Sequence, residues 1–215
     1  MPAKWPDDER APVHLAFYGE APGRYGADRS LCPFWGDKAA KVLYRALREA
    51  GVADWEGGRE VLDLFGIELI ERGLMPHVTG IMLSNAYDRC PAASPTRIRP
   101  PSRAEVQSPE NRARVTAELQ IAHERGCRNI VALGKVAGSV LGDVIAESFG
   151  DPNAFIIRVR PHPSALGLMQ SNRHRAPGYK LAELEDDWVA TTVGVVLDAL
   201  AWVHVPDAAP VDPEP

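Results

Sequence analysis

Four short runs of apolar residues, each bounded by turn residues, predict four buried β-strands in this chain of 215 residues. The predicted strands are Val13–Tyr18, Gly80–Ala86, Asn129–Leu133 and Phe155–Arg160. Apolar residues at helical spacing predict helices over Asp37–Ala50, Arg59–Arg72, Ser108 to about Arg125, Lys135–Glu147 and Leu181–Val203. Strands that alternate with helices predict an α/β fold: a single domain with a central parallel four-stranded sheet flanked by helices on both faces.

The two ends of the chain differ in composition from the middle. We expect an N-terminal extension at residues 1–10, one globular domain at 11–204 and a disordered tail, rich in proline and acid, at 205–215. The segment MPAKWPDDER carries acidic residues where a signal peptide would be apolar, and no apolar run reaches the length of a membrane span. We therefore expect a cytoplasmic protein that does not enter a membrane, and a monomer.

The cysteines and histidines argue against a metal centre. Cys32, Cys90 and Cys127 are odd in number and widely spaced, and no pair has C-x-x-C spacing. None of the six histidines lies four residues from another, which excludes a zincin-like helix. We expect no metal, no disulfide framework and no cofactor.

The charge distribution is uneven. A formal net charge of −5 argues against a protein that coats nucleic acid, because Lys and Arg contacts to phosphate supply most non-specific affinity. Segments 24–48, 89–114 and 158–175 nevertheless carry a net charge of +12 between them. Two interpretations stay open: the charges cover solvated helix faces, or the three segments form one local basic surface.

The loops after the predicted strands are the expected place for a ligand, because parallel sheets bind ligands at the carboxyl ends of their strands. These loops read GEAPG (19–23), NAYDRCPA (85–92), GKVAG (134–138) and PHPSAL (161–166). The glycines of the first loop would let a ligand approach backbone N–H groups, although an ordinary turn uses the same residues. The chain has neither a complete phosphate loop nor a G-x-G-x-x-G fingerprint, which disfavours a nucleotide-dependent α/β enzyme.

Taken in order, these segments resemble the motifs of the uracil-DNA glycosylase superfamily. The matching pieces are GEAPG, PFWGD (33–37), SNAYDRC (84–90), IVALG (130–134) and HPSAL (162–166). GEAPG resembles the first motif of family 4, whereas residues 23–47 are more similar to family 5. The resemblance implies an α/β/α sandwich. It also implies a monofunctional, base-flipping DNA glycosylase that hydrolyses the N-glycosidic bond of uracil, or of a related deaminated base, in base-excision repair.

The resemblance also implies functional roles for individual residues, each in a different motif. His162 matches the histidine that stabilises negative charge on O2 of the leaving uracil. Phe34 matches the aromatic ring that stacks on the flipped base, and Asn85 matches the amide that reads the base edge. The superfamily's best-known family has an aspartate where this chain has Ala21, so the residue that handles the attacking water is Glu20 as in family 4 or, as the second choice, Asp37 as in family 5.

Further residues would complete the substrate site. Besides Phe34 and Asn85, the residues expected to contact substrate are Gly19, Ala21, Gly23, Tyr25 and Ser164. Gly23 occupies the place where the strictest uracil enzymes have a tyrosine that blocks the thymine methyl group, and we expect Tyr25 to be able to fill that space. Leu166 matches the apolar wedge that replaces the flipped base. The basic residues expected to hold DNA phosphates beside it are Arg160, Arg173 and Arg175.

Two departures from the family pattern have consequences. Families 4 and 5 hold a four-iron cluster through four cysteines, including a C-x-x-C before the first motif, whereas no cysteine precedes Cys32 here. We therefore predict no iron–sulfur cluster. The missing aspartate at Ala21 keeps an alternative open: a member of the superfamily that binds DNA or a nucleobase with weak or no catalysis.

Overall fold

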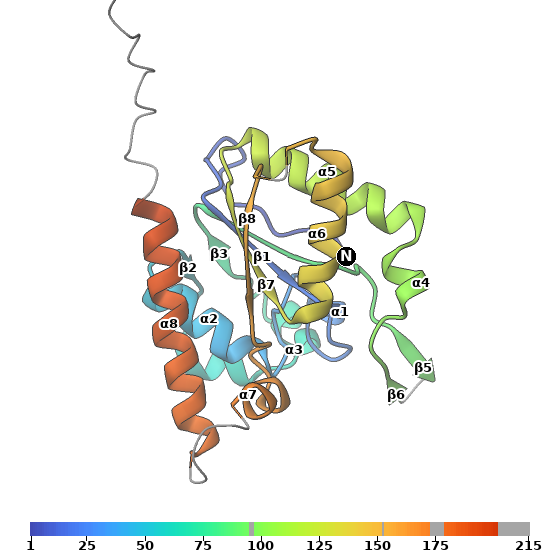
Figure 1. The fold of residues 1–215 in the computed structure, drawn as a ribbon. Helices are drawn as coiled ribbons and strands as arrows, with labels where there is room; N and C mark the ends of the chain where they lie inside the picture. Colours follow the sequence, from blue (N-terminus) through green and yellow to red (C-terminus); the bar gives the residue numbers. More distant parts are fainter. Residues whose placement is uncertain (95–96, 152, 173–178, 202–215) are drawn as a thin grey trace, which may run out of the picture.

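A parallel sheet of four strands forms the centre of the molecule. The computed structural model describes residues 1–94, 97–151, 153–172 and 179–201. The sheet order is β4-β1-β7-β8, with β1 at Leu15–Gly19, β4 at Ile81–Asn85, β7 at Asn129–Leu133 and β8 at Ile156–Arg160 (Figure 1). All three neighbouring pairs are parallel. The predicted strands and their parallel pairing are confirmed.

Helices cover both faces of the sheet, as predicted. Helices α2 (Ala40–Glu49) and α8 (Leu181–Ala201) lie against one face, and α5 (Pro109–Glu124) and α6 (Lys135–Ser148) lie against the other (Figure 1). Side chains alternate along β1 accordingly: Leu15 and Phe17 pack into the α2 and α8 core, whereas Ala16 and Tyr18 pack into the α5 and α6 core. The chain is therefore an α/β/α sandwich.

Shorter elements connect these layers and surround the carboxyl edge of the sheet. Four are helices of one or two turns and one is a 3-10 turn: α1 (Ala27–Ser30), α3 (Gly66–Glu71), α4 (Arg103–Val106), α7 (Ala165–Ser171) and η1 (Arg59–Asp63). Two antiparallel strand pairs complete the fold: β2 (Ala53–Asp54) with β3 (His77–Val78), and β5 (Ala92–Ser94) with β6 (Arg97–Ile98).

The prediction of one helix over Arg59–Arg72 is wrong. The segment divides into η1 and α3, and Leu64 and Phe65 between them are extended, with ψ of 148° and 160°. The Gly66 N–H donates to the carbonyl of Tyr25 at 2.9 Å instead of to a carbonyl of the preceding turn. A tertiary hydrogen bond has therefore replaced a helical one.

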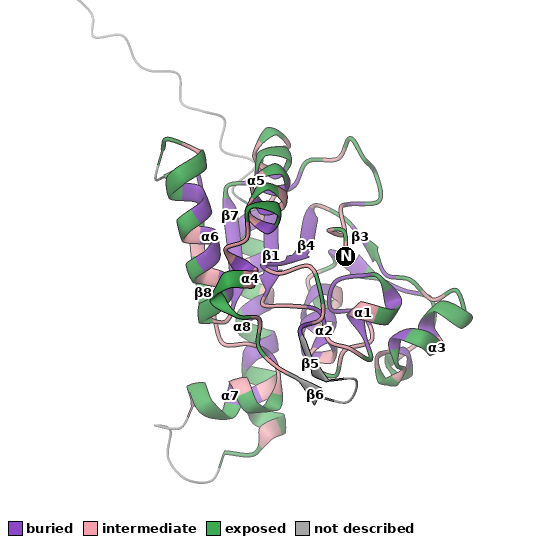
Figure 2. Ribbon diagram, turned by 90° about the vertical axis from the view of Figure 1, so that its right-hand side faces the viewer, coloured by how far each residue is buried: buried purple, intermediate pink, exposed green. Residues whose placement is uncertain are grey.

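The last strand is less buried than its sequence predicts. Val159 and Ile156 are exposed, because β8 is an edge strand and the helices leave part of it uncovered (Figure 2). At the opposite edge the N-terminal segment lies along β4, where Lys4 and Leu83 exchange two backbone hydrogen bonds of 2.8 and 2.9 Å. Within the described residues, no helix has both the length and the apolar character needed to cross a bilayer. The tail at 205–215 lies outside the described residues.

Candidate functional site

The predicted site residues come from loops that leave the same edge of the sheet. Gly19 pairs in register with Asn85, and Leu133 pairs with Arg160, so β1, β4, β7 and β8 all end together. The loop after β1 contains Glu20 and Gly23, and the loop after β8 contains His162. The topology therefore delivers the motifs to one edge, as parallel strands require.

Gly19, Phe34 and Asn85 meet at this edge. A Cβ atom added to Gly19 would lie 2.5 Å from Asn85 Oδ1 and 2.5 Å from Phe34 Cε1. Only glycine fits between these two groups, and the short distances place the amide and the ring on either side of one small space. Asn85 lies on the same face of the sheet as Leu83 and Ile81, which is the α2 face. The structure thus brings together three of the residues that the sequence analysis predicted to contact substrate.

Phe34 is presented by a strained and firmly anchored loop. Its φ of +66° is left-handed, a conformation that costs an aromatic residue roughly 1–3 kcal/mol. The anchors are hydrogen bonds of the Ser30 hydroxyl to the Trp35 carbonyl (2.7 Å), of the Tyr44 hydroxyl to the Pro33 carbonyl (3.0 Å) and of the Trp35 indole to the Leu74 carbonyl (2.8 Å). Such over-determined strain is common at ligand sites, and here it fixes the place of the Phe34 ring.

The Asn85 side chain is buried without a hydrogen-bond partner. It is 2% exposed, and neither Nδ2 nor Oδ1 makes a hydrogen bond with any described residue. Each unsatisfied buried polar group costs about 1–3 kcal/mol, so a donor and an acceptor left open side by side indicate that a ligand supplies their partners. A planar group with one acceptor next to one donor fits this pair.

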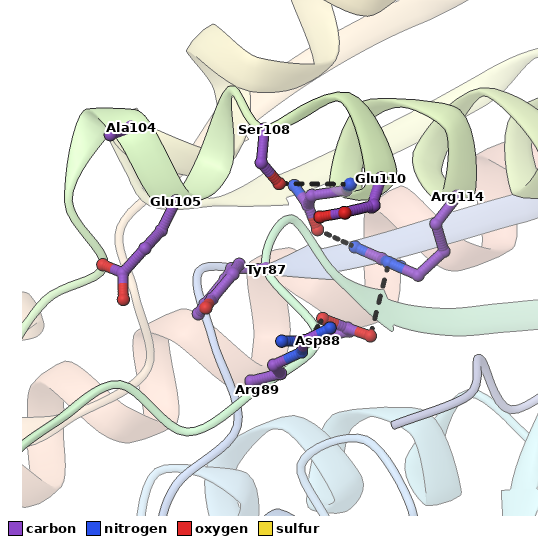
Figure 3. Close-up of a pocket in the computed structure, with 9 residues that line it drawn as sticks. Tyr87, Asp88, Arg89, Ala104, Glu105, Ser108, Glu110 and Arg114 are labelled. Atoms are coloured by element: carbon purple, nitrogen blue, oxygen red, sulfur yellow. Dashed lines mark hydrogen bonds and ion pairs between the residues drawn. The ribbon is translucent and has the colours of Figure 1, made fainter.

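The backbone of Asn85 is held from behind by α5. Arg114 Nη2 donates to the carbonyls of Asn85 (2.9 Å) and Ala86 (3.3 Å), and Asn111 Nδ2 donates to the Ala86 carbonyl (2.8 Å). Figure 3 shows Arg114 reaching from α5 towards Asp88, which follows β4 and lies 3.9 Å from Arg114 Nε. These contacts lock the end of β4 although the Asn85 side chain itself is free.

A buried carboxylate completes this support. Glu118 pairs with Arg114 at 2.7 Å and accepts hydrogen bonds from the Ser84 hydroxyl (2.8 Å) and the Tyr18 hydroxyl (3.2 Å). Burial and the adjacent Glu118 carboxylate raise the pKa of Tyr18 well above its usual value, so its phenol remains a donor. Sequence reasoning missed Arg114, Asn111 and Glu118. Asn111 and Arg114 lie three residues apart on a predicted helix, and Arg114 and Glu118 lie four apart. This spacing places the three side chains on one face of the helix, which is the signal in the sequence that could have identified them.

Asp37 joins the first loop to the Phe34 loop. Its carboxylate accepts hydrogen bonds from the N–H groups of Gly23 and Ala27, both at 3.2 Å. Burial raises the pKa of Asp37 to about 6 despite these donors. A Cβ added at Gly23 would collide with the same carboxylate, so Asp37 fills the space into which a side chain at 23 would project. Tyr25 is 59% exposed, and its role in excluding a 5-methyl group stays a prediction.

Glu20 has the freer carboxylate. It directly follows Gly19 and is half-buried, and burial alone raises its pKa. Among the described residues, no side chain or backbone group is bound to it. The backbone around it is fixed, because the N–H groups of Ala86 and Tyr87 donate to the carbonyls of Gly19 (2.8 Å) and Glu20 (2.9 Å). Neighbouring Ala21 brings no polar side chain. Glu20 is therefore able to bind water, whereas Asp37 is occupied in holding the loop.

His162 is held in one tautomer by the loop after β8. The Ser164 N–H donates to His162 Nδ1 at 3.3 Å, which leaves the ring proton on Nε2. Burial lowers the pKa of His162, so the ring is neutral at pH 7. The Ser164 hydroxyl caps α7 by accepting from the Gly167 N–H at 3.2 Å. A groove lined by Gly36, Pro163 and Ser164 places this loop opposite the Phe34–Asp37 loop.

The residues predicted to contact DNA are only partly described. Leu166 is 67% exposed on α7, and its role as a wedge stays a prediction. The Arg160 guanidinium is half-buried, with its central carbon 5.4 Å from the centroid of the Trp188 ring; the structure gives it a packing partner, and its phosphate contact stays a prediction. Arg173 and Arg175 lie outside the described residues.

Several basic side chains of these segments form ion pairs with acidic residues of the same chain. Arg45 pairs with Asp186 at 2.5 Å, Arg48 with Asp54 at 3.0 Å, and Arg112 with Glu147. Arg29 and Lys38 have no ion-pair partner among the described residues and are exposed. A basic rim therefore depends on fewer residues than the sequence count indicates.

The cysteines do not fit the iron–sulfur cluster of families 4 and 5. Cys32 is buried in the core on the α2 face, and Cys127 is buried in the core on the α5 face, so the sheet separates them. Burial raises the pKa of Cys32 to about 11 and that of Cys127 to about 12. Within the described part of the chain, no three His, Cys, Asp or Glu side chains form a group that would hold a metal ion.

The chain matches a model of a known protein family. The family model described as "Uracil DNA glycosylase superfamily" matches residues 6–185, which include the sheet and all the loops described above. No curated protein matches the chain.

Proposed function

Because the chain belongs to the uracil DNA glycosylase superfamily, we propose that it is a monofunctional DNA glycosylase of base-excision repair. Its substrate is DNA that contains uracil or a related deaminated base, and water is the nucleophile that replaces the base. The observation that carries the proposal is the buried, unpartnered amide of Asn85 beside the Phe34 ring.

The Asn85 amide has the polarity needed to read uracil. Its Nδ2 donates to O4 of the base, and its Oδ1 accepts from N3–H. Cytosine presents a donor at N4 and an acceptor at N3, so both contacts would be repulsive. The base reaches this depth only when it leaves the duplex stack, because its glycosidic bond is inaccessible inside the helix. Phe34 then supplies a ring against which the extruded base stacks.

His162 supplies a donor for the leaving group. Cleavage of the glycosidic bond leaves negative charge on O2 of uracil, and the neutral His162 ring donates its Nε2 proton as a hydrogen bond to that oxygen. The ring is already neutral and fixed in tautomer before substrate binds, so little reorganisation precedes the reaction.

Glu20 handles the attacking water. Burial raises the pKa of its carboxyl group, and in its ionised form the carboxylate accepts a hydrogen bond from water and faces the positive charge that develops on the sugar. The Asp37 carboxylate supports this step indirectly, because it holds the loop that carries Glu20 against the loop that carries Phe34. The nucleophile is thus oriented from one side while the base departs on the other.

Ala21 favours a second candidate function. The aspartate of the superfamily's best-known family is absent there, so a DNA-binding or nucleobase-binding module with weak catalysis is the alternative. The two differ in product: the glycosylase releases a free base and leaves an abasic site, whereas the module binds the oligonucleotide and leaves it intact.

The test is excision from oligonucleotides that differ only in the central base: uracil, hypoxanthine, xanthine, cytosine or thymine. Free base is measured by mass spectrometry and abasic sites by alkaline cleavage. Asn85→Asp should reduce uracil release and permit cytosine release, because the variant places two oxygens at the base edge and can donate only when protonated. Asn153→Asp, in an exposed turn, is the matched control. An unchanged base preference in Asn85→Asp would refute edge reading by this amide.

A further inference from the structure

An exposed surface of apolar and basic side chains lies beside the proposed active site. Its five residues are Tyr25, Arg29, Lys38, Phe65 and Ile67, which we name the aromatic shelf; they line a depression of about 680 Å³. Tyr25 is 59% exposed, Phe65 45% and Ile67 51%. Grouped apolar side chains of this kind on a protein surface mark an interaction site.

The backbone beneath the aromatic shelf is fixed. The Gly66 N–H donates to the Tyr25 carbonyl at 2.9 Å, which ties the start of α3 to the chain two residues before α1. The Phe65 N–H donates to Glu68 Oε2 at 2.9 Å. Gly66 also packs against the Gly26 carbonyl so closely that no side chain fits there. The backbone that carries the two rings is therefore ordered, while about half of each side chain remains exposed.

The charges on the aromatic shelf suit a polyanion. Arg29 and Lys38 are exposed and have no ion-pair partner among the described residues, unlike Lys41, which pairs with Asp63. Glu68, the nearest acid on α3, is directed to its own helix start. Two free cations beside two aromatic rings are complementary to a chain that carries phosphates and bases.

A groove connects the aromatic shelf to the proposed active site. A second depression, of about 360 Å³, shares Lys38 and Phe65 with the first and continues past Gly36 to Pro163 and Ser164. It therefore ends at the loop that holds His162. A DNA strand whose target base enters the proposed active site has a continuous path from that loop onto the aromatic shelf.

We propose that the aromatic shelf binds an unpaired nucleotide next to the target base, so that the enzyme acts preferentially on single-stranded DNA. The proposal rests on the glycosylase function proposed above and names the form of its substrate. In a duplex the neighbouring base is already stacked and paired, and the rings of Tyr25 and Phe65 cannot reach its face. In a single strand that face is free, and stacking on one aromatic ring changes affinity roughly five- to hundredfold per base.

The experiment compares uracil excision on single-stranded and double-stranded oligonucleotides of one sequence. Phe65→Ala should raise KM on the single strand roughly five- to hundredfold, change KM on the duplex less than about twofold, and leave kcat unchanged. Phe65→Trp should keep the single-strand KM, and Phe65→Leu should not, because stacking needs a flat ring. Leu197→Ala, an exposed apolar residue on α8, is the control and should change neither substrate.

Equal changes on both substrates, or none on either, would overturn the proposal. Fluorescence anisotropy with an oligonucleotide that contains no uracil measures DNA binding without excision. It therefore distinguishes failure of the aromatic shelf from failure of the glycosylase function. Binding that Phe65→Ala weakens supports the aromatic shelf even if no base is excised. Normal excision with no loss of single-strand binding in Phe65→Ala overturns the aromatic shelf alone. A dimer seen by sedimentation that Phe65→Ala dissociates would also overturn it, because the occupant would then be a second copy of the chain.

Discussion

Replacement of Gly19 by alanine tests the pocket with a single methyl group. Gly19 is buried at the end of β1, between Asn85 Oδ1 and Phe34 Cε1. Its φ is not in the left-handed region, so alanine adopts the same backbone without strain. The variant therefore changes the space between the amide and the ring and leaves both chemical groups intact.

The size of the effect follows from the two contacts. The new Cβ would lie 2.5 Å from each atom, whereas ordinary van der Waals contact begins at 3.4 Å, so both groups must withdraw by about 0.9 Å. A displacement of about 1 Å at a reacting centre costs about a hundredfold in rate, equivalent to roughly 2.7 kcal/mol in the barrier. Overpacking of a core contact destabilises folding by about 1–3 kcal/mol, which lowers Tm by several degrees.

The assay is single-turnover release of uracil from a single-stranded oligonucleotide at a temperature well below Tm. Gly142→Ala is the matched control: it lies in α6, and an added Cβ has no atom within 4 Å. That variant should keep the wild-type rate and gain about 0.5–1 kcal/mol in stability. If Gly19→Ala also released uracil within about twofold of the wild-type rate, Asn85 and Phe34 would not form the base pocket.

Three further predictions concern the groups around this pocket. His162→Ala should lower the rate of excision about a hundred- to a thousandfold and retain DNA affinity. In the wild type, burial lowers the pKa of His162, so the ring should stay neutral below pH 6.5. Excision should therefore decline only as the pH falls through that lowered pKa. Glu20→Gln should reduce excision and abolish the part of the acid limb that the raised pKa of Glu20 produces, because only the ionised carboxylate orients water. Arg114→Met should lower the free energy of unfolding by about 3–5 kcal/mol, measured in urea, because Glu118 is left buried and unpaired.

A different experimental result would contradict each of these three predictions. Undiminished turnover in His162→Ala would remove the imidazole from the mechanism. If Glu20→Gln had the same pH–rate profile as the wild type, another group would orient the attacking water, and Asp37 would be the next residue to test. For Arg114→Met, the control is the double variant with Glu118→Gln, which removes the unpaired charge and keeps an acceptor for the Ser84 and Tyr18 hydroxyls, so it should recover much of the lost stability. A single variant as stable as the wild type would show that α5 does not support β4.

The sheet was predictable because its signal is local. The runs at β1, β4 and β7 are apolar at every position except the polar ends, and buried parallel strands need no other pattern. The meeting of Phe34, Asn85 and Gly19 was also within reach, since parallel strands bring their carboxyl ends to one edge and the motif order supplied the loops.

The parts that sequence reasoning missed depend on contacts between distant residues. The break between η1 and α3 is caused by the Gly66 hydrogen bond to Tyr25, and the clamping role of Asp37 depends on amides fourteen and ten residues away. Arg114 reaches the carbonyl of Asn85 across twenty-nine residues. Helical periodicity and loop motifs contain no information on such pairs, so the support of the site was visible only in the fold.

The position of the base in a complex with substrate tests the proposed site most directly. A single-stranded oligonucleotide with 2′-fluoro-deoxyuridine, whose fluorine destabilises the oxocarbenium-like transition state, would be crystallised with the wild-type protein. We expect an extruded uracil stacked on Phe34, with its O4 and N3 hydrogen-bonded to the Asn85 amide and its O2 near His162 Nε2. A uracil bound elsewhere, with the Asn85 amide still unpartnered, would contradict it.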